Sequence, residues 1–95
     1  MDRSIRIGVY KILRKLGAKR EEIDPDVKLQ NLLEYYADDW NILLFFLESK
    51  FDIFISQDQE QAIVTVEDTI EIVHSNLNKS INFVPNVLQS KLMLA

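Results

Sequence analysis

Residues 36–52 read YADDWNILLFFLESKFD, a short acidic start followed by a continuous apolar run. Asp38 and Asp39 favour the positive end of a helix, because carboxylates stabilise the unpaired N–H groups of a first turn. The pattern therefore predicts a helix from about Ala37 to Lys50. Its apolar side chains are expected to divide into a core set and a partly outward set. The core set is Leu43, Leu44, Phe46, Leu47 and Phe51, and the outward set is Trp40, Ile42 and Phe45.

Two further principal helices are predicted, one on each side of this stretch. Apolar residues recur at helical spacing over residues 4–16 with the bases outward, and Gly17 supplies the C-terminal cap. Thr65 and Asp68 resemble a capping box at the start of a last helix, which should cover about residues 66–77.

The connections between these helices are predicted to differ. Residues 18–36 cannot form one continuous helix because Pro25 interrupts them, and their regularly placed apolar residues favour an ordered loop. Alternation around Ile53 and Ile55 could suggest a strand, but the chain has no second alternating run to pair with it. We therefore expect a bend that leads into a short helical turn over residues 57–61.

The composition indicates a single small domain. A chain of 95 residues, 47% of them hydrophobic, suffices for one modest core. It has no cysteine, so packing must supply the stability that disulfides give elsewhere, as suits a reducing compartment. No apolar run is long enough to span a bilayer, and the first residues lack the apolar core of a signal peptide. We expect a cytoplasmic protein without membrane insertion.

The charges are distributed unevenly along the chain. Residues 1–20 carry seven bases and one acid, whereas residues 21–95 carry four bases and 14 acids. The net charge of −10 over the second part repels phosphate backbones, which counts against nucleic-acid binding. The basic segment could bind an anionic surface, but we favour the interpretation that its bases form the solvated face of an amphipathic helix.

Four short patterns in one register connect these predictions to a known family. They are LGAKREEI at residues 16–23, the loop residues Leu29 and Leu33, the group Leu47-Glu48, Phe51-Asp52 and Ile55, and the group Thr65-Val66 with Ile70. Together they resemble acyl and peptidyl carrier proteins over roughly residues 5–77. The resemblance implies an all-α, acyl-carrier-protein-like four-helix bundle with a long first loop, formed by residues 1–77. A C-terminal extension would follow over residues 78–95.

The resemblance fails at the residue that gives carriers their chemistry. In that family an Asp-Ser-Leu motif opens the second helix, and its serine holds a phosphopantetheine arm. Here Ala37 takes the serine's place, and no serine or threonine lies between Ser4 and Ser49. The chain is also similar to small bacterial carrier-like proteins with Gly-Asp-Asp at this turn. Because an alanine methyl cannot form a phosphodiester, we expect a carrier scaffold without a cofactor.

Neither the acidic residues nor the single histidine indicates catalysis. Asp38 and Asp39 could be paired carboxylates, but adjacent helical residues point about 100° apart and would need a third group to hold a metal. His74 has no cysteine partner and is expected at the surface or at its boundary. No serine lies in a nucleophile-elbow context, and a single histidine disfavours a triad. We expect neither enzymatic activity nor a metal site.

The exposed part of the predicted 37–50 helix is the expected interaction surface. Carriers present their second helix to partner proteins, so the resemblance implies a non-enzymatic protein–protein interaction module that kept the shape and lost the arm. A working acyl or peptidyl carrier with a non-standard attachment site is the alternative. The residues expected to contact a protein partner, or a second copy in a homodimer, are Asp38, Asp39, Trp40, Ile42 and Phe45.

The sequence leaves open what covers this surface. In the C-terminal extension, Pro85 suits the first turn of a helix, and Val84 and Leu88 could share one face. So short a helix needs a surface to lie on, and without one the extension is expected to be disordered. Either the extension, including Phe83, folds back over the apolar side chains of the 37–50 helix, or a partner covers them.

Overall fold

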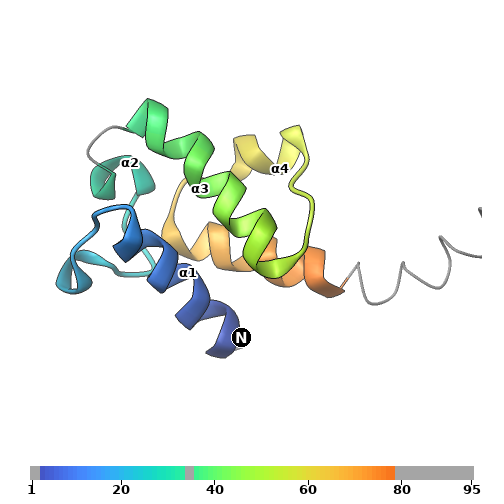
Figure 1. Ribbon diagram of the computed structural model, residues 1–95, viewed down its shortest axis with the longest axis horizontal. Coiled ribbons are helices and arrows are strands. Elements are labelled where there is room, and N and C mark those ends of the chain that lie inside the picture. Colours follow the sequence, from blue (N-terminus) through green and yellow to red (C-terminus); the bar gives the residue numbers. More distant parts are fainter. Residues whose placement is uncertain (1–2, 34–35, 79–95) are drawn as a thin grey trace, which may run out of the picture.

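The computed structural model describes residues 3–33 and 36–78, which form an all-α helical bundle with a long first loop (Figure 1), as the sequence predicts. No β-strand is present in these two ranges. The predicted extension over residues 78–95 lies outside the described residues except for residue 78, which is still helical. The helices are α1 (Arg3–Lys15), η1 (Arg20–Glu22), α2 (Leu29–Leu32), α3 (Tyr36–Phe51), α4 (Gln57–Ala62) and a further helix over 66–78.

Helix α1 ends in the way that its glycine predicts. The Gly17 N–H donates to the Arg14 carbonyl at 3.0 Å, and the Ala18 N–H reaches back to the Leu13 carbonyl at 3.0 Å. This pair of bonds is a Schellman motif, which needs a residue with positive φ at the glycine position. Gly17 has φ +112°, so the cap depends on the absence of a Cβ there.

The first loop is ordered because its backbone is bonded to the start of the 66–78 helix. Lys28 and Thr65 form an isolated antiparallel bridge. Beside it, N–H groups donate to carbonyls at 2.9–3.0 Å. These bonds run from Leu29 to Val64, from Val66 to Val27 and from Glu67 to Pro25. We call this set of bonds the loop clamp. Over its described residues 18–33 the prediction of an ordered loop is confirmed, whereas the short helices η1 and α2 within it were not predicted.

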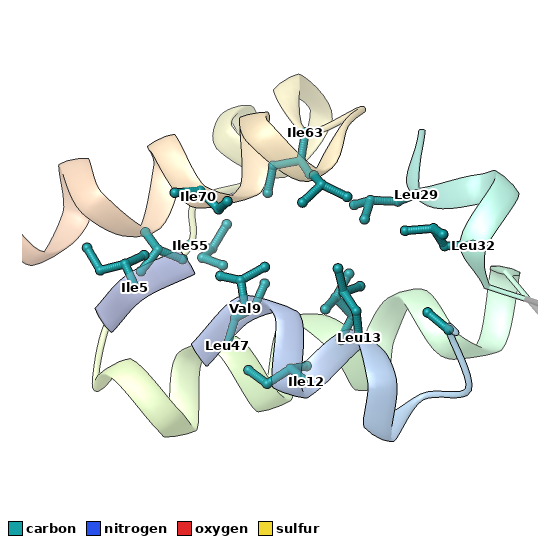
Figure 2. Packing of buried hydrophobic residues seen from close by; sticks show 14 of the residues in the cluster. Ile5, Val9, Ile12, Leu13, Leu29, Leu32, Leu47, Ile55, Ile63 and Ile70 are labelled. Carbon is teal, nitrogen blue, oxygen red and sulfur yellow. The ribbon is translucent and has the colours of Figure 1, made fainter. Parts of the chain in front are cut away.

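The core lies between α1, α3 and the 66–78 helix, with α2 closing one end (Figure 2). Leu43 and Leu47 of α3 are fully buried, as predicted. The prediction for the other three residues of the core set is confirmed only in part, because they pack against the core cluster but are not fully buried. The reason is geometric. Residues four apart share one line along a helix. Leu43 and Leu47 occupy the line that faces the core, and Leu44 and Phe46 lie to either side of it, whereas Phe51 continues the line but is the last residue of α3. The partly buried residues are Leu44, Phe46 and Phe51.

Helices α1 and α3 run side by side in opposite directions (Figure 1), and a glycine lies at their contact. A Cβ placed on Gly8 would lie 2.7 Å from Cζ of Phe51 and 3.0 Å from Cε of Lys50. Both distances are shorter than van der Waals contact, so the absence of a side chain at Gly8 permits this approach of the two helices.

The short helix predicted over residues 57–61 is confirmed as α4, and a buried polar side chain holds it in place. Asn76 of the 66–78 helix is only 6% exposed. Its Nδ2 donates to the Phe54 carbonyl at 2.9 Å and to Oε1 of Gln59 at 3.0 Å, while Oδ1 accepts from Gln59 Nε2 at 2.7 Å. Because these bonds satisfy the buried amide, they fix both α4 and the preceding bend against the bundle.

The predicted capping box at the start of the 66–78 helix is confirmed. The Asp68 N–H donates to Oγ1 of Thr65 at 3.1 Å, while Oδ2 of Asp68 accepts from the N–H groups of Thr65 and Val64 at 2.9 Å and 3.0 Å. The Thr65 N–H, together with that of Val64, lowers the pKa of Asp68 below its ordinary value, although partial burial opposes this effect.

Acidification should destabilise the domain through this cap. Because the folded-state pKa of Asp68 is depressed, its carboxylate contributes stability above about pH 4 that is lost as the pH falls through the folded pKa. Thermal denaturation followed at several values between about pH 7 and about pH 2 should show this loss, and Asp68→Asn should show a shallower pH dependence. An unchanged slope in the variant would contradict this role for Asp68.

Candidate docking surface on helix α3

One side of α3 faces solvent along most of its length. Asp38, Ile42 and Phe45 are four and three positions apart, which aligns them on one stripe of the helix. All three are exposed, Ile42 to 42% and Phe45 to 63%. Asn41 and Ser49 are exposed beside them. These five residues form what we call the α3 face, a polar-edged strip with an aliphatic and an aromatic side chain at its centre.

One flank of this face is occupied by α4 and the bend before it. The Trp40 Nε1–H donates to Oε1 of Glu60 in α4 at 2.9 Å. Further along, Oε2 of Glu48 accepts from the Ile55 N–H at 2.9 Å. Trp40 is partly buried and directed toward α4, so the structure separates it from the stripe of Asp38, Ile42 and Phe45 with which it was grouped.

The other flank is formed by α1, where an open groove of about 550 Å³ lies beside α3. Its lining residues are Lys11, Ile12, Arg14 and Lys15 of α1 and Lys50 of α3. We call it the basic groove.

Two aromatic side chains connect the basic groove to the α3 face. Nζ of Lys15 lies 5.4 Å from the centroid of the Phe46 ring, within the range of a cation–π contact. The ring centroids of Phe46 and Phe45 are 6.1 Å apart in a tilted arrangement. Phe46 therefore bridges the cations of the groove and the exposed Phe45 ring.

The acidic start of α3 is where the sequence predicts it. Asp38 and Asp39 lie in the first turn, and Asp38 is exposed whereas Asp39 is partly buried. Ala37 also belongs to this turn. Within the described ranges, no three His, Cys, Asp or Glu side chains are grouped so that they could hold a metal ion. His74 is partly buried, in agreement with its predicted boundary position.

Three exposed apolar side chains and the basic groove were not predicted. Phe54 is 77% exposed, Val64 48% and Ile7 44%. The alternation of buried Ile53 and Ile55 around Phe54 was a usable signal for its outward direction. For the basic groove the only indication in the sequence was a weak one, the excess of bases over residues 1–20. The contribution of Lys50 could not be read from the sequence, because this residue belongs to a separate helix.

Two further findings concern the kind of protein rather than the geometry of the surface. No helix in the described ranges combines the length and the apolar character needed to cross a bilayer. No model of a known protein family matches the chain.

Proposed function

We propose that this chain is a non-enzymatic, carrier-like module whose α3 face binds a protein partner, and that it acts in the cytoplasm without a phosphopantetheine arm. The carrier-like part of this proposal rests on the sequence patterns described above, and the docking part rests on the α3 face. Ala37 stands where the resemblance puts the attachment serine, which leaves surface recognition as the role that the scaffold can still perform.

The observation that carries the proposal is the exposure of Phe45 in line with Ile42. Single exposed apolar residues are ordinary on protein surfaces. A phenylalanine that is 63% exposed next to an exposed isoleucine, on a helix with α4 on one flank and an open groove on the other, is a more specific feature. Burying such a side chain fully contributes roughly 1.5–3 kcal/mol, and aromatic anchors dominate many protein interfaces.

Replacing Phe45 with glutamate should abolish partner binding without unfolding the domain. The substitution places a charge at the centre of the α3 face, where its desolvation would oppose association. Affinity capture from cells that express the chain, followed by mass spectrometry, should lose specific partners for Phe45→Glu. Sedimentation of the purified protein tests separately whether that partner is a second copy.

Phe54→Glu is the matched control, because Phe54 is also exposed but lies in the bend before α4. It makes the same chemical change and should keep the captured partners. Circular dichroism should show equal helix content in both variants and in the wild type. Capture that is indifferent to Phe45→Glu would remove the support for the α3 face as the docking surface.

The alternative is a working carrier with a non-standard attachment site, and an intact mass decides between the two. Incubation with coenzyme A and a phosphopantetheinyl transferase should leave the wild-type mass unchanged, since Ala37 offers no oxygen for the phosphodiester. Restoring serine at position 37 need not be sufficient, because Asp38 stands where the family motif has leucine. A mass increase of one phosphopantetheine on the wild-type chain would refute the pseudo-carrier proposal.

A further inference from the structure

We infer that the basic groove between α1 and α3 receives an acidic segment of the protein that docks on the α3 face. This inference rests on the proposed docking function and adds the chemistry of the partner to it. A carrier-like scaffold is expected to offer acids to its partners from its second helix, whereas this groove offers cations.

The groove concentrates positive charge around an apolar floor. Four of its five lining residues are cationic and none carries a carboxylate. Lys11, Arg14 and Lys15 are exposed, whereas Ile12 is only 5% exposed and belongs to the core. The ion pair that the described residues form on α1 uses Arg6, which lies 3.2 Å from Glu67, and so draws on a different side of this helix.

The groove and the α3 face form one continuous surface through Phe46. Lys15 lies over the Phe46 ring at 5.4 Å, and that ring neighbours Phe45 at 6.1 Å. A helical partner segment with apolar side chains over Phe45 and carboxylates one helical turn further along would therefore contact the α3 face and the basic groove at once. This is the pattern of an acidic amphipathic helix, in which charged and apolar residues alternate at helical spacing.

The charges around the groove favour a protein segment over other anionic ligands. Asp38 is exposed on the α3 face, which adjoins the groove through Phe46. A flat anionic membrane or a nucleic acid that covered both parts would meet this carboxylate together with the cations, which opposes binding. The cations are exposed and the groove is open, so it lacks the enclosure of a small-molecule site. A folded partner can place carboxylates opposite the cations alone.

A labelled synthetic peptide tests the inference directly. The probe carries glutamate and leucine at helical spacing, and a second peptide with glutamine in place of glutamate is its neutral counterpart. Fluorescence anisotropy should show binding of the acidic peptide that weakens with added salt, and no comparable binding of the neutral peptide. Failure of the acidic peptide to bind at low salt, or equal binding of both peptides, would overturn the inference.

Charge reversal locates the site. The variant Lys15→Glu/Lys50→Glu changes two cations of the groove and should weaken acidic-peptide binding by about tenfold or more. The variant Lys19→Glu/Lys28→Glu makes the same change in net charge at two exposed residues outside the groove, and should weaken binding less than about twofold. Equal losses in the two variants would mean unspecific attraction and overturn the inference.

Two further measurements separate this inference from the function on which it rests. If Phe45→Glu abolishes capture of the cellular partner while reversal of the groove leaves that capture intact, the α3 docking function stands and the acidic groove is overturned. If the protein sediments with vesicles of anionic lipid, and this binding rather than peptide binding depends on Lys15 and Lys50, the occupant is a membrane and the inference is again overturned. Loss of partner capture in both variants, with Lys19→Glu/Lys28→Glu unaffected, supports it.

Discussion

Leu47→Ala is expected to lower the free energy of unfolding by about 2–5 kcal/mol. Leu47 is fully buried on the line of α3 that faces α1 and the 66–78 helix, so its truncation removes packing from all three helices and leaves a cavity. A small domain of this kind has roughly 5–15 kcal/mol of stability in total. Urea denaturation should therefore show a clear fall in the midpoint with little change in slope.

Phe46→Ala provides the internal comparison for this prediction. The sequence placed Phe46 in the core beside Leu47, but the structure leaves its ring partly buried, in contact with Lys15 and Phe45. Truncation there should cost less than about 2 kcal/mol, because most of the lost contact is at the surface. If Phe46→Ala lowers the free energy of unfolding more than Leu47→Ala does, that would contradict the finding that α3 directs Leu47 rather than Phe46 into the core.

Gly8→Leu is expected to destabilise the domain by about 1–3 kcal/mol through overpacking. Any Cβ at this position would lie 2.7 Å from the Phe51 ring, and the longer leucine side chain has to enter the contact between α1 and α3. Gly8→Ala should be milder, because the better helix propensity of alanine, about 1 kcal/mol, offsets part of the steric cost.

A double-mutant cycle isolates the steric term. Phe51→Ala removes the ring that meets the new Cβ, so Gly8→Ala should be more favourable in the Phe51→Ala background than in the wild type. Thermal denaturation of the four proteins gives this coupling energy. Additive effects of the two substitutions would mean that the close approach at Gly8 does not constrain the helix contact.

The features that the sequence predicted well depend on residues that are close together in the chain. Helix α1 ends through a bond from Gly17 to a carbonyl three positions earlier and one from Ala18 to a carbonyl five positions earlier, and the capping box joins Thr65 to Asp68. Local chemistry of this kind is readable without knowledge of tertiary structure. The register of the carrier resemblance likewise predicted the outward direction of Ile42 and Phe45 on α3, which their exposure confirms.

The features that could not be predicted depend on how the helices pack. Residues 42–47 of α3 are all apolar, so the periodicity of the sequence does not distinguish Leu47 from its neighbour Phe46 as the core residue. The direction of Trp40 is connected to Glu60, which follows it by 20 residues on a separate helix. The basic groove likewise has lining residues from separate helices, Lys15 of α1 and Lys50 of α3. No local sequence pattern shows which residues of separate helices will lie together.

The loop clamp has a consequence for the order in which the chain can acquire its structure. Val27 and Leu29 form backbone bonds with Val66 and Val64, so the backbone groups of the loop clamp have no partner until the segment beyond α4 is present. During synthesis from the N-terminus, α1 and α3 can form and meet first, while the loop between them stays open on the ribosome. Closing it late adds a long-range step to an otherwise local helical bundle, and this step should set the folding rate.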